Sequence, residues 1–289
     1  MRKTIGWLVA MAYALVGARR RVVKRLKAGG RLPVVVHALS AEQLDRILAW
    51  LKRHGVIDSL WLTFDDAWIT LKDSLPVLEK YNVPVKVFVA PGQTIRGNVW
   101  TEEANQLGVP ASTWRSWYSL SESDRNANLS QFPVPHSPAV ALAKGGSPLA
   151  SRSPGEGWFP IPHSPFPVTL LPKNEVIELS KHPLISIENH TWSHLSAPHR
   201  PMDEVIAEVV KTQETLAEWT GRRPEWLAWP FGRGTPELDA KMAELGLKTV
   251  YTRQGYDIGH CRNMALDGMT FQENLGRILG AWPKVGETL

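Results

Sequence analysis

The stretch from Leu60 to Ala67 reads Leu-Trp-Leu-Thr-Phe-Asp-Asp-Ala, a short apolar run that ends in two adjacent carboxylates. Successive side chains of a strand point to opposite faces, so Asp65 and Asp66 at a strand end are expected to face different targets. Two acids at one strand end can therefore serve two functions. The alternative is that one of them only caps the next helix, because Asp is a favoured capping residue.

A second motif, His190-Thr-Trp-Ser-His194, follows another apolar run far along the chain. Two histidines four residues apart form a candidate metal-binding pair. The single cysteine, Cys261, excludes an intramolecular disulfide framework and any multi-cysteine metal site. Metal chemistry in this chain would therefore depend on His and carboxylate ligands.

The composition is that of an ordinary soluble globular protein. The 289 residues are 43% hydrophobic and 21% charged, and the length suits one large α/β domain or two small ones. The net charge of +5 comes from one end of the chain. Residues 1–31 hold nine of the 33 Lys and Arg residues and no acid, which leaves 24 basic against 28 acidic residues elsewhere. We therefore expect no nucleic-acid partner.

Residues 1–30 are predicted to be a basic N-terminal helix separate from the main domain. An apolar stretch from Ile5 to Ala18 precedes the basic run Arg19–Arg25, and it is short for a membrane span. We expect this helix to lie on an anionic membrane surface, with the protein peripheral at the cytoplasmic face of the inner membrane. Export through a signal-like N-terminus, or a helix packed on the domain, are the alternatives.

From residue 31 onwards, apolar runs alternate with helical patterns. Ser40 and Gln43 form the signature of a capping box, and Gly55 ends the helix that follows it. Alternation of this kind predicts a parallel sheet with crossover helices, and we expect a distorted (β/α) barrel of six or seven parallel strands over residues 31–289. The predicted strands are Leu32–His37, Leu60–Phe64, Pro84–Ala90, Leu184–Ile187, Trp226–Trp229 and Lys248–Thr252.

Residues 95–172 interrupt this alternation. The segment is rich in Pro, Gly and Ser, lacks sustained periodicity, and contains two near-identical heptapeptides, Phe132–Pro138 and Phe159–Pro165. Such an insertion in a compact domain is expected to be a functional loop or disordered chain rather than core. We expect it to act as a lid or a tether and to influence substrate choice.

The candidate functional residues all follow predicted strands. The carboxyl ends of the strands form the face of a (β/α) barrel that carries the active site, so these residues are expected to converge there. They are His37, Asp65, Asp66, His190, His194 and the turn Pro230-Phe231-Gly232.

One carboxylate and two imidazoles form a three-ligand metal set that leaves a coordination position open for water, which suits hydrolysis. A divalent ion lowers the pKa of such a water from about 15.7 towards about 7 and polarises a carbonyl oxygen. The second carboxylate can then accept a proton, a backbone N–H of the Pro-Phe-Gly turn can stabilise an oxyanion, and an imidazole can protonate a leaving amine. The pattern predicts cleavage of an amide or an ester.

At these residues the sequence resembles the polysaccharide deacetylases, the NodB-like carbohydrate esterases. Thr63–Asp66 matches their Thr-Phe-Asp-Asp-Gly motif, His190–His194 matches their His-(Ser/Thr)-x-x-His motif, and Leu227–Gly232 resembles a third motif. The similarity covers roughly residues 31–95 and 172–255. It implies a distorted (β/α) barrel that removes N-acetyl groups from amino sugars with a divalent metal ion, zinc in the first place and cobalt or nickel otherwise.

The resemblance also implies a role for individual residues. Carried over by motif, Asp65 is the general base and Phe231 donates an N–H to the oxyanion. The implied metal ligands are Asp66, His190 and His194.

Three departures from the family pattern stand out. Ala67 occupies the place of the motif glycine, and Ala228 occupies the place where many members have an arginine that orients the catalytic aspartate. The Leu-His motif that supplies a general acid near the C-terminus is missing. The chain resembles the biofilm-polysaccharide deacetylases more closely in having a histidine on the first strand, so His37 is the implied general acid and His260 the alternative.

The sequence therefore predicts a metal-dependent hydrolase that removes N-acetyl groups from an amino-sugar-containing polysaccharide or a glycolipid precursor. The alternative is a glycan-binding pseudoenzyme of the same fold, which Ala228 and the long insertion motivate.

Overall fold

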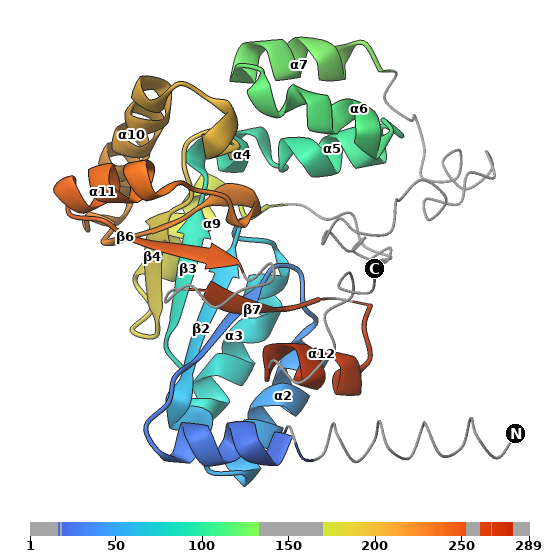
Figure 1. Ribbon diagram of the computed structural model, residues 1–289, viewed down its shortest axis with the longest axis vertical. Helices are drawn as coiled ribbons and strands as arrows, with labels where there is room; N and C mark the ends of the chain where they lie inside the picture. The colour runs from blue at the N-terminus through green and yellow to red at the C-terminus, as the bar shows by residue number, and fades with distance from the viewer. Residues whose placement is uncertain (1–16, 18, 133–169, 253–260, 267, 280–289) are drawn as a thin grey trace, which may run out of the picture.

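The computed structural model describes residues 17, 19–132, 170–252, 261–266 and 268–279. Within them, seven parallel strands form a closed barrel in chain order, and β7 pairs with β1 to complete it (Figure 1). The predicted distorted (β/α) barrel is confirmed. The strands are β1 (Leu32–Val36), β2 (Leu60–Asp65), β3 (Val85–Val89), β4 (Ile185–Asn189), β5 (Trp226–Ala228), β6 (Lys248–Thr252) and β7 (Cys261–Ala265).

Alternation along each strand separates an outer layer from the barrel interior. In β3, Val85, Val87 and Val89 pack outward into the main core, so Phe88 points inward, where it packs with residues of β5 and β6. Asp65 is paired with Phe88 in the parallel register of β2 and β3. The side chain of Asp65, the last residue of β2, therefore points into the barrel interior at the carboxyl end of the strand.

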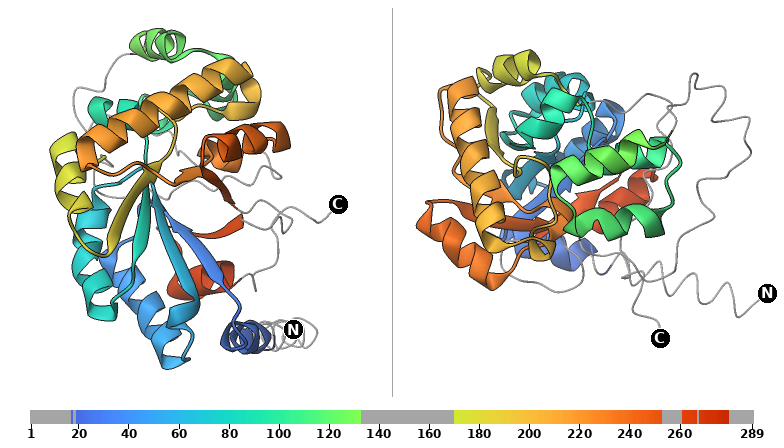
Figure 2. Two further views of the ribbon diagram at one scale, coloured as in Figure 1. Left: turned by 90° about the vertical axis from the view of Figure 1, so that its left-hand side faces the viewer. Right: turned by 90° about the horizontal axis from the view of Figure 1, so that it is seen from above.

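Helices cover the outside of the barrel, as both views of Figure 2 show. The main core lies between β1–β4 and the apolar faces of the helices, and α2 contributes the buried stripe Leu44, Ile47, Leu48 and Leu51. The outer helices are α2 (Ala41–Arg53), α3 (Thr70–Tyr81), α9 (Lys173–Ser180), α10 (Met202–Thr220), α11 (Pro236–Glu244) and α12 (Phe271–Ile278).

The predicted capping box at the start of α2 forms only in part. Ser40 Oγ accepts a hydrogen bond from the N–H of Gln43 at 3.3 Å. The Gln43 side chain does not return the bond, because its Nε2 donates to the carbonyl of Met269 at 2.6 Å instead. Gln43 thus connects α2 to the residues just before α12 (Phe271–Ile278).

Residues 95–132 are mainly helical, so the prediction of a loop or disordered chain is wrong for this part of the insertion. Each helix has at most nine residues, which is too few to show a periodic pattern. Gly97 and Gly108, which have positive φ, end α4 and α5 and separate the helices. Residues 133–169, with almost all of the repeated heptapeptides, lie outside the described residues. The segments are α4 (Pro91–Arg96), α5 (Trp100–Gln106), α6 (Ala111–Ser116), η2 (Trp117–Ser119) and α7 (Glu122–Ser130).

We call α5, α6 and α7 the insertion helices. They have their own core, which contains Trp100, Trp114, Tyr118 and Leu129 together with Phe231 of the Pro-Phe-Gly turn. Figure 1 shows them together at one end of the molecule, next to α4, to which β3 leads. The insertion helices therefore lie at the carboxyl ends of the strands.

The described part of the N-terminal segment packs on the domain. Residues 19–27 are helical, Leu26 is buried in the main core, and Arg19 donates a hydrogen bond to the Gln272 side chain at 3.0 Å. This agrees with the packed-helix alternative. Residues 1–16 lie outside the described residues, so membrane-surface association stays a prediction. Within the described part of the chain, no helix has both the length and the apolar character of a membrane span.

Candidate metal centre and catalytic site

The predicted metal ligands meet at the carboxyl ends of β2 and β4. Asp66 Oδ1 lies 3.5 Å from His190 Nε2 and 3.4 Å from His194 Nε2, and one ligand atom of each residue lies within 4.8 Å of the others. All three side chains are buried. The structure thus brings together residues that are more than 120 positions apart in the sequence.

Left-handed backbone places these ligands. Asp66, Thr191 and His194 have φ values of 68°, 61° and 52°, which cost about 1–2 kcal/mol each for a residue with a Cβ. The side-chain oxygen of Asn189 accepts a hydrogen bond from the N–H of Thr191 at 2.8 Å and so stabilises the turn at Thr191. Ala67, at φ 52°, retains strain that the motif glycine would avoid, although its buried methyl group offsets about 0.8 kcal/mol of it.

A backbone contact fixes the tautomer of His190. Its Nδ1 lies 2.7 Å from the carbonyl oxygen of Ala228, which can only accept a hydrogen bond, so Nδ1 carries the proton. Burial lowers the pKa of His190 to about 4, which keeps the ring neutral. Nε2 therefore presents a lone pair to Asp66, as a metal-ligating histidine does.

The same geometry fits a metal ion. Asp66 Oδ1 is buried and has no hydrogen-bond partner among the described residues. Three ligands at about 2.0–2.1 Å from a tetrahedral zinc ion lie roughly 3.3–3.4 Å apart, which matches the separations of Asp66 Oδ1 from the two imidazoles. Burial, and then the charge of Asp65, raise the pKa of Asp66 well above its ordinary value. A bound cation would reverse that effect.

Asp65 has a different partner, one that the sequence analysis did not identify. Its two carboxylate oxygens accept hydrogen bonds from the two terminal nitrogens of Arg262 in β7, at 2.6 and 2.8 Å. Arg262 also donates to Thr63 Oγ1 at 2.9 Å and is fully buried. This bidentate pair lies inside the barrel and fixes the orientation of the Asp65 carboxylate.

Arg262 also keeps Asp65 ionised. Burial alone would raise the pKa of Asp65, but the charge of Arg262, with smaller contributions from His190 and His37, lowers it below its ordinary value. An arginine of β7, two strands along the barrel from β5, thus takes the place of the arginine that the family pattern has at position 228. Strand β7 reads Cys-Arg-Asn-Met-Ala and has no alternation of apolar residues, so its arginine gave no signal of a buried position.

His37 and Phe231 complete the neighbourhood. His37 follows β1, burial lowers the pKa of its imidazole, and the charge of Asp65 acts to raise it. Phe231 lies in the short turn η4 (Pro230–Gly232) with φ 61°, and its ring centroid is 4.6 Å from that of His194 and 4.8 Å from that of Tyr118. His260, the alternative general acid, lies outside the described residues.

Comparison with known proteins identifies the family. The model of the family described as Polysaccharide deacetylase matches residues 52–250. The chain belongs to this family. A polysaccharide deacetylase fold agrees with the closed barrel and with the converging motif residues. No curated protein matches the chain significantly.

Solved structures with the same fold include other deacetylases. The Streptococcus pyogenes deacetylase PplD, solved in complex with acetate, has a TM-score of 0.52 and 15% identity over 86% of this chain and 98% of its own. A polysaccharide deacetylase from Bacillus cereus has a TM-score of 0.50 and 12% identity over 85% of this chain and 67% of its own. At these identities the likeness shows the fold alone, and a closer relation to the biofilm-polysaccharide deacetylases stays a prediction.

Arg262→Met is expected to lower the free energy of unfolding by about 3–5 kcal/mol, because it leaves the buried Asp65 carboxylate without its counter-charge. Arg262→Lys, which keeps the charge but loses the bidentate geometry, should cost less. Urea denaturation followed by circular dichroism measures both. Arg222→Met removes an exposed guanidinium 3.8 Å from Glu225 and serves as the control, with a change within about 0.5 kcal/mol. Equal effects at positions 222 and 262 would contradict the pairing.

Proposed function

We propose that the protein is a metal-dependent hydrolase that removes N-acetyl groups from an amino-sugar-containing polysaccharide or a glycolipid precursor. The observation that carries the proposal is that two adjacent acids, Asp65 and Asp66, have different partners. Asp66 faces two imidazoles at 3.4–3.5 Å, whereas Asp65 is held by Arg262 and is not needed as a ligand. Membership of the polysaccharide deacetylase family supports the reaction class.

Asp66, His190 and His194 would hold the divalent ion. Zinc suits a set of nitrogen and carboxylate donors, and cobalt and nickel accept the same ligands. When bound, the ion lowers the pKa of a coordinated water and polarises the acetyl carbonyl. The three ligand side chains are buried, and the low polarity around them would strengthen electrostatic interactions at the site.

Asp65 is the proposed general base. Its carboxylate is ionised and uses two acceptor positions for Arg262, which leaves further lone pairs free to accept a proton. Asp65 directly precedes Asp66 at the end of β2. The carboxylate of the proposed base contacts Arg262, and that of the proposed ligand faces the two imidazoles. A proton acceptor adjacent in sequence to a metal ligand supports general-base catalysis on a water held by the ion.

Two further groups complete the proposed mechanism. The N–H of Phe231, in the left-handed turn after β5, is proposed to donate to the oxyanion. His37 is proposed to protonate the leaving amine, and its burial-lowered pKa makes the imidazolium a stronger acid towards that amine. The pseudoenzyme alternative is motivated by Ala228 and the long insertion, and the contact of Arg262 with Asp65 removes the first of these two reasons.

Asp65→Asn is expected to reduce acetate release from N-acetylglucosamine oligomers by about 100-fold to 10,000-fold and to leave the zinc content unchanged. Asp66→Ala is expected to abolish both. Acetate assay and elemental analysis of the same preparations measure the two effects, and Asp73→Asn, at an exposed position of α3, is the control. Full activity in Asp65→Asn would refute its role as the base.

Removal of the metal with a chelator is expected to abolish acetate release, and added Zn²⁺ or Co²⁺ should restore it. Because the metal ion would bind the folded state and not the unfolded state, adding it to the metal-free protein should also raise the thermal unfolding midpoint, by more at higher metal concentration. The His190→Ala variant should show neither response. Undiminished acetate release after complete metal removal would rule out the proposed mechanism.

His37→Ala is expected to slow release from an N-acetylated sugar by about 100-fold or more, because the amine leaves poorly without a proton. An aryl acetate ester has a leaving group that needs no proton, so its hydrolysis should be nearly unaffected in the same variant. Steady-state rates on both substrates give the comparison, and Asp65→Asn should lose activity on both. Equal losses on the two substrates in His37→Ala would show that His37 is not the general acid.

A further inference from the structure

A buried polar network lies behind the metal-ligand motif. Ser193, between the two histidines, is fully buried. Its N–H donates to Glu208 Oε2 at 3.0 Å and its Oγ donates to Glu208 Oε1 at 2.6 Å. Arg125 donates to the Oγ of the same serine at 2.8 Å and to its carbonyl oxygen at 3.3 Å. Every hydrogen-bonding group of Ser193 thus contacts one of two charged residues.

These charged residues come from different parts of the fold. Glu208 belongs to α10, which packs on the barrel, whereas Arg125 belongs to α7 of the insertion helices. A second contact from the insertion helices reaches the adjacent residue, because Trp100 Nε1 donates to the carbonyl oxygen of His194 at 3.1 Å. The guanidinium of Arg125 lies 5.0 Å from the ring centroid of Trp100, so both contacts belong to one unit.

We infer that Glu208 and Arg125 are positioning residues for the metal ion, and that they act by fixing Ser193 and hence the imidazole of His194. The inference rests on the proposed function. His194 has a positive φ, a conformation that persists only where the surroundings impose it. Nδ1 of His194 has no hydrogen-bond partner among the described residues, so its ring is not oriented from its own outer nitrogen as that of His190 is. Its orientation therefore depends on its backbone and on ring packing, such as that with Phe231 at 4.6 Å.

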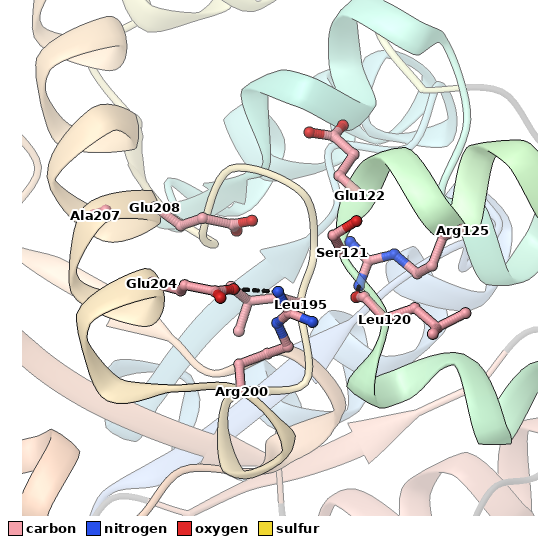
Figure 3. A pocket seen from close by; sticks show the side chains of 9 residues that line it. All are labelled: Leu120, Ser121, Glu122, Arg125, Leu195, Arg200, Glu204, Ala207 and Glu208. Atoms are coloured by element: carbon pink, nitrogen blue, oxygen red, sulfur yellow. Dashed lines mark hydrogen bonds and ion pairs between the residues drawn. The ribbon is translucent and has the colours of Figure 1, made fainter.

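The pocket beside this network offers a matched control. Figure 3 shows Glu204, Ala207 and Glu208 of α10 on one side and the α7 residues on the other, around a cavity of about 250 Å³. Glu204 lines the same cavity one helical turn from Glu208, but its carboxylate pairs with Arg200 and not with the motif. The two glutamates therefore share helix and cavity and differ in partner.

Glu208→Gln is expected to lower the affinity for Zn²⁺ by about 10-fold to 100-fold, the range found when an outer partner of a metal ligand is lost. Glutamine replaces one of the two carboxylate oxygens by an NH2 group, so the N–H and the Oγ–H of Ser193 can no longer each donate to a separate oxygen. Arg125→Met should act in the same direction, and Arg125→Lys, which keeps a donor and the charge, should recover part of the affinity. Glu204→Gln should leave the affinity unchanged. Competition of the full-length protein with a fluorescent zinc chelator measures all four.

Thermal unfolding of the metal-free proteins separates positioning from stability. A positioning role predicts that added Zn²⁺ raises the unfolding midpoint less in Glu208→Gln than in wild type, whatever the metal-free midpoints are. Ser193→Ala keeps the backbone bond to Glu208 and provides a milder variant if Glu208→Gln does not fold. Wild-type affinity in Glu208→Gln, or in Ser193→Ala and Arg125→Met, would overturn the inference and leave the proposed function intact. Absence of zinc binding by the wild type would overturn both.

Discussion

A buried carboxylate stays ionised only beside a positive charge, and this constraint organises the whole site. Burying an ionised group without a partner is far more costly than any single contact in the fold returns. Asp65 and Asp66 are both buried, and the structure pairs the first with Arg262. Among the described residues no Lys or Arg forms an ion pair with Asp66, which faces the nitrogen atoms of two imidazoles instead. Under the proposed function, a metal ion would supply the positive charge beside this second carboxylate.

The pKa values of the two acids are shifted in opposite directions for a physical reason. The guanidinium of Arg262 outweighs burial and lowers the pKa of Asp65, whereas burial and the charge of Asp65 raise the pKa of Asp66. Asp65 is the last residue of β2 and Asp66 follows it with left-handed backbone, so the two carboxylates face different partners. Left-handed backbone at Asp66 and His194 stores strain where the ligands meet, as is common at functional sites.

Much of this site could be predicted from the sequence, because strand ends and motif residues are local signals. Six strands and the strand-end positions of the candidate site residues needed only apolar runs followed by polar residues, whereas the choice of Asp66, His190 and His194 as ligands rested on the resemblance to the family motifs. The seventh strand could not be recognised, since its composition is not that of a buried strand. The capping box of Thr270 and Glu273 at the start of α12 is a signal that would have located the last β/α unit and drawn attention to Arg262.

The helices of residues 95–132 could not be predicted for a different reason. Short helices separated by glycines show no periodicity, and their stability comes from packing among Trp100, Trp114, Tyr118 and Phe231. Phe231 and Arg125 link this packing to His194 and Ser193, so residues 95–132 support the metal-ligand motif from outside. Tertiary contacts of this kind cannot be read from a single sequence.

X-ray absorption spectroscopy at the zinc edge of the zinc-loaded protein tests the central claim most directly. It should show two imidazole nitrogens and a carboxylate oxygen at about 2.0–2.2 Å, and the imidazole scattering should weaken in His194→Ala. A sulfur ligand at about 2.3 Å, or a shell without imidazole scattering, would contradict the account, because the ion would then not lie between Asp66, His190 and His194.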